Sequence, residues 1–247
     1  MKFVGVDLGW QSQPSGFCTL ILQGDRLTLA TLTRYDRHGE VLAAIAAIAE
    51  PALIAVDAPT LIPNATGMRM PDRLAHRYFG KYHAGAYPAN QSLPFAAHTV
   101  AFGQALEAQG FAHAPTLIPR QPGRYQIEVF PHPATITLFG LPRILRYKKG
   151  RLADRAAELT RLRQYLQTVL PTLVPPCFLP ELPPIPATGA ALKEVEDRLD
   201  SLLCAYIGAH WWYWGTARNW VLGDRAQGYI VVPAPSSTEL FGPAQLS

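Results

Sequence analysis

The first ten residues, MKFVGVDLGW (Met1 to Trp10), place an acidic residue at the end of a short apolar run. Phe3 to Leu8 has the apolar, partly β-branched character of a strand, and the Gly that follows indicates a turn. An Asp that ends a central strand points its carboxylate at the carboxyl edge of the sheet, where open α/β sheets bind ligands. Asp7 is therefore a candidate site residue, with a turn residue before Gly9 as the alternative interpretation.

Further segments extend this strand into a βββαβ order, with strands at Gly16 to Gln23 and Arg26 to Arg34, a helix at His38 to Glu50 and a strand at Ala52 to Asp57. Gly24-Asp25 joins the second and third strands as a tight hairpin. The last segment, ALIAVD, is a continuous apolar run, as expected of a strand buried on both faces. Asp57 ends this strand as Asp7 ends the first one, although an Asp-x-Pro turn is the alternative.

The rest of the chain predicts an insertion followed by more strands and helices. Residues 58–123 are rich in Pro, Gly, Asn and His, with helical patches at about Pro71 to Phe79 and Pro94 to Gln109. Beyond them we expect a strand at Tyr125 to Phe130, helices at Pro133 to Phe139, Leu152 to Leu170 and Ala190 to Trp214, a stiff Pro-rich surface linker at Pro171 to Pro186, and a late edge strand at Gly228 to Val232. We interpret residues 1–247 as one domain with an insertion at about 58–123.

Three more acidic residues are candidates for the same site. Glu128 lies inside the apolar strand YQIEVF, where a carboxylate is costly unless it is paired or bound to a cation, or faces solvent at an edge. Asp197 and Asp200 are three residues apart on the final helix and share one face with small residues. A face of small residues lets a helix approach a sheet closely, which would bring both carboxylates near the strand ends. A solvated first helical turn is the alternative.

These acidic residues are the kind of ligand that a divalent metal prefers. Mg²⁺ favours oxygen ligands and is commonly held by one or two carboxylates together with substrate phosphates. Two such ions, about 3.5–4 Å apart, can activate the attacking water and stabilise the leaving oxygen of a phosphodiester. None of the spacings is a specific motif, so the metal hypothesis requires that Asp7, Asp57 and either Asp197 or Asp200 converge in space.

The order of elements and acidic residues resembles the ribonuclease H-like superfamily, which includes RuvC-type resolvases. More closely, the chain resembles family 429 of the domains of unknown function, a group of predicted ribonuclease H-like nucleases. The matching segments are short and span most of the chain: VGVDLGW (Val4 to Trp10), VDAPTLIP (Val56 to Pro63), RMPDRLAHRYFG (Arg69 to Gly80), IEVFPHPA (Ile127 to Ala134) and EDRLDSLLCAYIGAHW (Glu196 to Trp211).

The resemblance implies an α/β, ribonuclease H-like three-layer fold with a central mixed sheet, in which strands 1–3 are antiparallel and later strands parallel. It implies Mg²⁺ or Mn²⁺ as cofactor. The implied metal ligands are Asp7, Asp57, Glu128 and Asp200, with Asp197 as a further ligand or a replacement for one of them, and these five acidic residues form the implied catalytic set. It also implies that a helix of the insertion binds phosphate or braces the site through Arg69, Asp72 and Arg77. A surface helix with an internal Asp-Arg pair is the alternative.

A basic segment and two aromatic positions add candidates for substrate binding. The segment RILRYKKGR (Arg143 to Arg151) has five basic residues in nine. Arg146, Lys148 and Lys149 can therefore neutralise phosphates, and Tyr147 can stack on a base. A solvated charged surface is the alternative. His132 is either a general base or a structural residue. The HWWYW cluster at 210–214 is typical of core or of a subunit contact, which leaves a dimer possible.

Composition excludes a disordered chain and an integral membrane protein. Hydrophobic residues make up 49% and charged residues 16% of the 247 residues. No apolar run reaches the ~18 residues of a membrane span, and MKFVGVDLG lacks a signal-peptide pattern, so we expect a cytoplasmic protein. The three cysteines suggest neither a disulfide framework nor a zinc site. The net charge of +4 fits a polyanion-binding protein but is a weak signal.

The leading functional hypothesis is a metal-dependent nuclease that acts on DNA or RNA by attack of a metal-bound water. A non-catalytic nucleic-acid-binding protein on the same fold is the first alternative. A nucleotide-dependent phosphotransferase of the actin and sugar-kinase type is the second, because that group also begins with a strand and a Gly-rich turn. It requires a second Gly-rich phosphate turn after a later strand, and the sequence contains no such turn.

Overall fold

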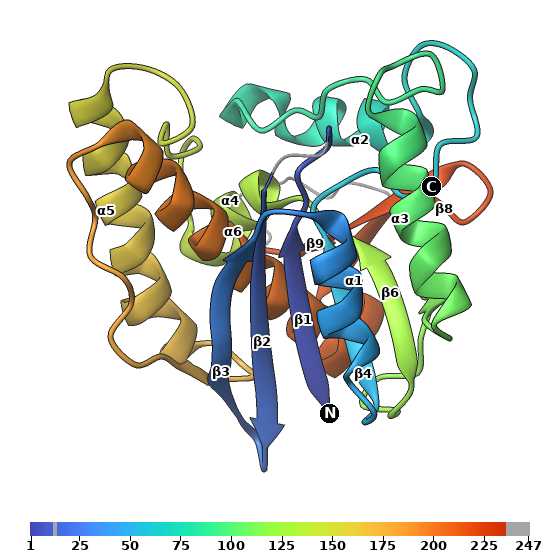
Figure 1. The fold of residues 1–247 in the computed structure, drawn as a ribbon, viewed down its shortest axis with the longest axis horizontal. Helices are drawn as coiled ribbons and strands as arrows, with labels where there is room; N and C mark the ends of the chain where they lie inside the picture. Colours follow the sequence, from blue (N-terminus) through green and yellow to red (C-terminus); the bar gives the residue numbers. More distant parts are fainter. Residues whose placement is uncertain (12–13, 236–247) are drawn as a thin grey trace.

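A seven-stranded mixed sheet forms the centre of the computed structural model, which describes residues 1–11 and 14–235 (Figure 1). The strands follow the order β5-β6-β4-β1-β2-β3-β7, and β2 runs antiparallel between β1 and β3, whereas β1, β4, β6 and β5 run parallel. Their bounds are β1 Lys2–Asp7, β2 Ser15–Gln23, β3 Arg26–Tyr35, β4 Ala52–Val56, β5 Ala112–His113, β6 Arg124–Glu128 and β7 Cys177–Phe178. The predicted fold class, a ribonuclease H-like mixed sheet with three antiparallel strands followed by parallel ones, is confirmed.

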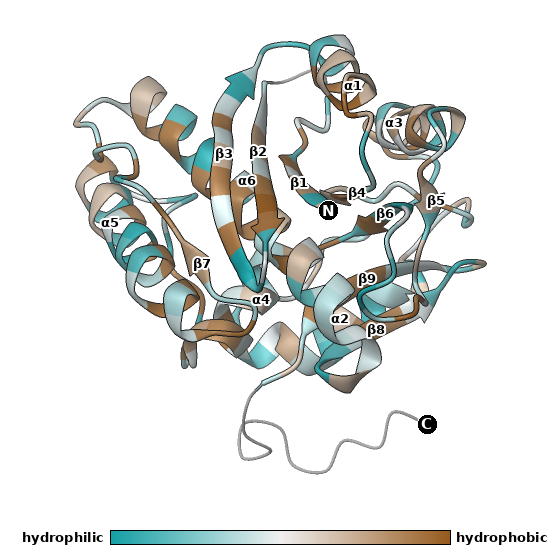
Figure 2. Ribbon diagram, turned by 90° about the horizontal axis from the view of Figure 1, so that it is seen from below, coloured by the Kyte–Doolittle hydropathy of each residue, from teal (hydrophilic) through white to brown (hydrophobic). Residues whose placement is uncertain are grey.

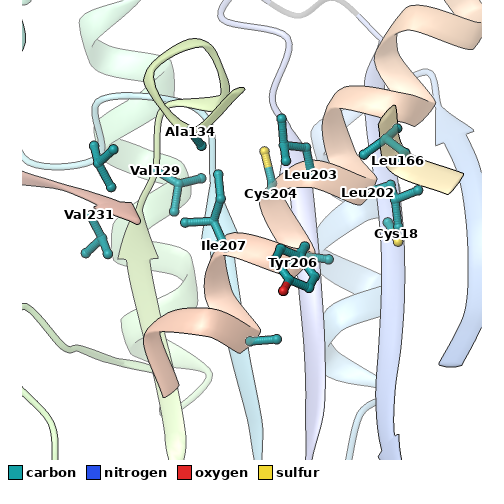
Figure 3. Packing of buried hydrophobic residues seen from close by; sticks show 14 of the residues in the cluster. Cys18, Val129, Ala134, Leu166, Leu202, Leu203, Cys204, Tyr206, Ile207 and Val231 are labelled. Atoms are coloured by element: carbon teal, nitrogen blue, oxygen red, sulfur yellow. The ribbon is translucent and has the colours of Figure 1, made fainter. Parts of the chain in front are cut away.

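Helices cover both faces of the sheet. On one face, α1 (His38–Ala46) and α3 (Ala96–Ala108) pack on alternate side chains of β1 and β4 such as Val4 and Ile54. On the other face lies the 26-residue helix α6 (Gly189–Trp214), together with α4 (Pro131–Phe139) and α5 (Leu152–Val169). Figure 2 shows the two helical layers on opposite sides of the strands. Figure 3 shows α6 side chains packed with residues from β2 and from the end of β6.

Small residues bring α6 into backbone contact with the sheet, as the sequence predicted. A Cβ atom on Gly5 of β1 would lie 1.9 Å from the Ser201 carbonyl oxygen, and one on Gly16 of β2 would lie 1.9 Å from the Asp197 carbonyl oxygen. Neither position therefore has room for a side chain. The contact holds the part of α6 that carries Asp197 and Asp200 against β1 and β2, close to Asp7.

The predicted insertion, residues 58–123, places its first helix above the carboxyl ends of the parallel strands and α3 on one face of the sheet (Figure 1). It contains α2 (Met70–Phe79), a 3-10 turn at Gly80–Tyr82 and α3, close to the predicted helical patches. It also supplies β5, a two-residue strand that the sequence did not predict, which pairs with β6 at one edge of the sheet. The insertion thus both covers the strand ends and extends the sheet.

Three local expectations need correction. The Pro-rich segment 171–186 is not only a surface linker, because it supplies β7, which pairs in parallel with β3, and it buries Cys177 and Leu182. The late strand β9 (Gly228–Pro233) forms a hairpin with β8 (Asn219–Asp224), which was not predicted. It meets the central sheet at the Val129–Val231 bridge and through Tyr229, whose hydroxyl donates to the Gln126 carbonyl of β6 at 3.0 Å. Helix α1 ends at Ala46 and not at Glu50.

The aromatic cluster at the end of α6 belongs mainly to the core. Trp211 is fully buried and donates a hydrogen bond to the Ala114 carbonyl, and Trp212 donates one to the Gln121 carbonyl. Both hydrogen bonds connect residues 58–123 to α6. None of the helices in residues 1–11 and 14–235 combines the length and the apolar character that a membrane span requires.

Candidate functional site

Asp7 and Asp57 lie side by side at the carboxyl edge of the sheet. They follow the paired positions Val6 and Val56 of two parallel strands, and the Asp57 N–H continues the ladder by donating to the Val6 carbonyl at 2.8 Å. Both residues are half-buried, and neither carboxylate makes a hydrogen bond or an ion pair with any residue in 1–11 or 14–235. The pair therefore brings two carboxyl groups together without a contacting cation among the described residues.

Burial makes the ionised form of both carboxylates unfavourable. It raises the pKa of Asp7 well above its ordinary value; the Lys148 ammonium opposes this shift, whereas the charges of Asp200, Asp57 and Asp197 add to it. Burial likewise raises the pKa of Asp57 to about 7, again against the influence of Lys148. The three carboxylates that act on Asp7 are three of the four that the sequence grouped with it; Glu128 is the fourth and is not among them.

Asp200 is fully buried, unlike Asp7 and Asp57, and its position on α6 places it near the carboxyl edge of the sheet. Lys148 Nζ lies 2.8 Å from Asp200 Oδ2, and the Tyr147 hydroxyl donates to Asp200 Oδ1 at 2.7 Å. Burial alone would raise the pKa of Asp200, but the Lys148 ammonium and the Tyr147 hydrogen bond hold it below its ordinary value. Asp200 is thus ionised and paired, in contrast to Asp7 and Asp57.

Lys148 is the cation of this cluster. Its positive charge is the largest attractive influence on both Asp7 and Asp57, although it contacts only Asp200. The sequence predicted Lys148 as a phosphate ligand and Tyr147 as a stacking residue. Tyr147 is fully buried, so it cannot stack on a base, and in this structure Lys148 neutralises protein carboxylates.

Asp197 lies on the other side of Asp7 and is already neutralised. Its carboxylate accepts from Arg34 Nε at 3.0 Å and pairs with Lys193 Nζ at 2.8 Å, and Lys193 also contacts Glu196 at 2.7 Å. Asp7, Asp197 and Lys193 line a cavity of about 340 Å³. Two cations on one carboxylate make Asp197 less free than Asp7 to accept a further ion.

Glu128 is close to the group but is held by an arginine. Arg69 Nη2 and Nη1 donate to its two carboxylate oxygens at 2.6 and 2.8 Å, and Arg69 also pairs with Asp72 at 2.8 Å. All three residues are buried. Burial raises the pKa of Glu128 to about 7 in spite of Arg69. The sequence left two possibilities for a buried Glu128, an ion pair or a bound metal. In the structure Glu128 forms an ion pair with Arg69.

Arg69 and Asp72 brace α2 and the site wall. Asp72 accepts hydrogen bonds from the Arg69 N–H at the start of α2 and from the Ala89 N–H of the following loop, both at 3.0 Å. Arg77, the third residue of the predicted set, is exposed and does not line the cavity described next. The helix therefore contributes a buried ion network and not three phosphate ligands on one face.

A cavity of about 900 Å³ connects these buried groups with solvent. Its lining includes Asp57, Arg69, Glu128 and Lys148 together with exposed residues of the insertion and of the basic loop, among them Tyr87, Arg143, Arg146 and Lys149. His132 also lines it, and burial lowers the pKa of its imidazole to about 4, so the ring is neutral near pH 7. The two predicted residues Arg146 and Lys149 thus lie at the mouth of the cavity that reaches Asp57.

Sequence reasoning missed two aromatic residues of the site. Trp10 lines both cavities and donates from Nε1 to the Asp57 carbonyl at 3.1 Å, and its ring packs on Phe95. Tyr87 is 72% exposed on the rim of the larger cavity. Trp10 directly follows the Asp7 turn, which was a usable signal, whereas nothing in the sequence around Tyr87 distinguishes it from other loop tyrosines.

The three-carboxylate convergence that the metal hypothesis requires is not present in the described part of the chain. Among residues 1–11 and 14–235, no three His, Cys, Asp or Glu side chains are arranged to hold a metal ion. The donor chemistry still suits a divalent cation, because Asp7 and Asp57 are oxygen donors without partners among the described residues, whereas Asp200 is held by the Lys148 ammonium and the Tyr147 hydroxyl.

The sheet order and the acidic edge define an α/β protein with a central mixed sheet and carboxylates at the carboxyl ends of its parallel strands. The chain belongs to the family described as protein of unknown function DUF429, whose model matches residues 5–225. The RuvC structure from Thermus thermophilus is similar at 12% identity and a TM-score of 0.36, over 84% of this chain and 97% of the RuvC chain. No curated protein matches the sequence.

Proposed function

We propose that the protein is a metal-dependent nuclease that hydrolyses phosphodiester bonds of nucleic acid. The observation that carries the proposal is the pair Asp7 and Asp57, two adjacent carboxylates at the sheet edge with raised pKa values and with no contacting partner in the part of the chain that the structure describes. Maintaining such a pair is costly unless a cation offsets the repulsion. An arrangement that costs stability at a solvent-connected cavity favours a functional role.

Asp7 and Asp57 would hold Mg²⁺ or Mn²⁺, with Asp200 as the third ligand once Lys148 withdraws. The ion, when bound, supplies Lewis-acid stabilisation and lowers the pKa of a bound water. The chain itself positions the substrate, because Arg143, Arg146 and Lys149 are exposed cations at the cavity mouth that can pair with backbone phosphates. Glu128 supports the site through Arg69 and is not part of the proposed ligand set.

Cleavage assays on a panel of DNA and RNA oligonucleotides test the function directly. We expect cleavage with Mg²⁺ or Mn²⁺, none with excess chelator, and a loss on the order of 10²-fold in Asp57→Asn, the range reported for removing one preorganised electrostatic group. Asp25→Asn, at the exposed β2–β3 turn, is the matched control and should cleave like the wild type. Absence of cleavage on every substrate, or equal cleavage by Asp57→Asn, would refute the proposal.

Lys148→Met tests the competition between the ammonium and a metal ion for Asp200. Without metal we expect the variant to lose about 2–3 kcal/mol of stability, below the usual 3–5 for a broken buried pair because Lys148 is partly exposed. Added Mg²⁺ should then stabilise the variant more than it stabilises the wild type, since no ammonium has to leave. Thermal denaturation with chelator or Mg²⁺ measures both effects, and Lys149→Met is the exposed control. An identical Mg²⁺ response in both proteins would contradict the competition.

Binding of nucleic acid without turnover is the second candidate function. The Lys148–Asp200 ion pair at 2.8 Å favours it, because a permanently seated ammonium group would neutralise the acidic residues and leave no place for a metal. Under this alternative the protein binds oligonucleotides with an affinity that chelators do not change, and Lys148→Met gains no response to Mg²⁺.

A further inference from the structure

We propose that the substrate is an unpaired, single-stranded segment of nucleic acid, with one base stacked on Tyr87. This inference rests on the proposed function and specifies its substrate class. Three observations carry it: the exposure of an aromatic ring at the cavity mouth, the cations around that ring, and the size and depth of the cavity.

Tyr87 presents its ring to solvent beside a lysine from the opposite wall. The side chain is 72% exposed on the loop that follows α2, and Lys149 of the loop between α4 and α5 donates from Nζ to its hydroxyl at 3.2 Å. The same ammonium lies 5.5 Å from the ring centroid. A ring that is 72% exposed and has this one ammonium over it keeps open surface for a base, and base–aromatic stacking is the usual way in which single strands are bound.

Three exposed cations line the same cavity as Tyr87. Arg143, Arg146 and Lys149 make no ion pair with any residue in 1–11 or 14–235, and Lys149 is the one that contacts the Tyr87 hydroxyl. The cavity is also lined by Asp154 and Glu158 of α5, and Glu158 is paired with Arg161 at 2.9 Å. Three cations without an ion pair among the described residues, in one cavity with a stacking ring, match a nucleic-acid backbone that carries one charge per phosphate.

The cavity has the size of a small-ligand site and is too small to enclose an intact double helix. Its volume of about 900 Å³ falls in the range of cavities that enclose small ligands, roughly 300–1,000 Å³. It runs from exposed Tyr87 to the buried Arg69–Glu128 pair, with Asp57 in its lining. A phosphodiester must enter this space to reach Asp57. A stiff duplex cannot fold into it, whereas an unpaired strand bends readily and can insert a base.

Fluorescence anisotropy with labelled oligonucleotides separates binding from cleavage. Measured with chelator present, the wild-type protein should bind a single strand or a duplex with a single-stranded overhang at least about tenfold more tightly than a blunt duplex. Tyr87→Ala should weaken single-strand binding on the order of 10- to 100-fold, the cost of losing one stacked base. Tyr87→Phe keeps the ring and should bind like the wild type. Duplex binding should be the same for all three proteins.

The outcomes distinguish this inference from the proposed function. Equal affinity for single strand and duplex, or an unchanged affinity in Tyr87→Ala, overturns the single-strand inference even if metal-dependent cleavage occurs. Single-strand binding that depends on the Tyr87 ring supports the inference even if no cleavage is found, in which case the nuclease proposal alone fails. A mononucleotide that competes as strongly as an oligonucleotide would also overturn it, since the ligand would then be a free nucleotide.

Discussion

Replacing Asp7 with Asn should remove most of the proposed nuclease activity and at the same time make the metal-free protein more stable. Asp7 is the carboxylate on which the charges of Asp57, Asp197 and Asp200 all act, so it is the centre of the acidic group. Loss of its charge weakens every proposed arrangement of a metal ion at this edge. We expect a decrease on the order of 10³-fold in cleavage, the upper end for one preorganised electrostatic group.

The gain in stability has a defined dependence on pH. Because burial raises the folded-state pKa of Asp7 above its unfolded value of 3.8, the wild-type protein loses stability as the pH rises from about 4 toward that folded-state pKa. The Asn variant lacks this loss. Its advantage should therefore grow with pH and reach about 0.5–2 kcal/mol near neutrality, a usual gain for a substitution that relieves a functional site. Denaturant unfolding at pH 4 and pH 7 with chelator measures it, and a variant less stable than the wild type at pH 7 would contradict the explanation.

Replacing Arg69 with Met should cause the largest loss of stability. Arg69 is buried and is the shared partner of Glu128 and Asp72, so its removal leaves two buried carboxylates without a cation. Breaking a buried ion pair on one side costs about 3–5 kcal/mol. Part of the loss should disappear at low pH, because protonated Glu128 needs no cation and its pKa, already about 7 in the wild type, rises further without Arg69.

Urea unfolding at pH 5 and pH 8 tests this prediction. The difference in unfolding free energy between wild type and Arg69→Met should be smaller at pH 5. Arg77→Met is the matched control on the same helix, and because Arg77 is exposed and forms no ion pair with a described residue, its effect should stay within about 0.5 kcal/mol. The double variant Arg69→Met/Glu128→Gln should recover part of the lost stability. A loss in Arg69→Met no larger than that in Arg77→Met would show that the buried network contributes little.

The sequence predicted the elements whose signals are local. β1 and β4 are short apolar runs that end in Asp, and both the strands and the adjacent position of their carboxylates follow from that pattern. The close approach of α6 also followed from its small residues. In contrast, β7 has two residues in a Pro-rich segment and β5 two residues in the insertion, so neither has a periodicity to detect.

The partners of the acidic residues could not be predicted, because they come from distant parts of the chain. Lys148 and Tyr147 reach Asp200 over more than fifty positions, and Arg69 reaches Glu128 over 59. The sequence showed that a buried Glu128 needs a cation, but not whether that cation is a guanidinium group or a metal. The role of a charged residue thus depends on tertiary pairing, which composition and spacing do not determine.

The contact between Gly5 and Ser201 bears on the size of ion that the acidic edge can select. Because two backbones touch there, the separation of the main chains that carry the strand carboxylates and those of α6 is fixed, and only side-chain rotamers can adjust the carboxylates. Mg²⁺ requires oxygen atoms at about 2.0–2.1 Å in near-octahedral order, whereas Ca²⁺ accepts about 2.3–2.6 Å and variable geometry. If the proposed metal site forms, a main-chain spacing fixed in this way would favour the smaller, stricter ion. Discrimination between divalent ions would then originate in two missing side chains, at Gly5 and Gly16, rather than in the identity of any ligand.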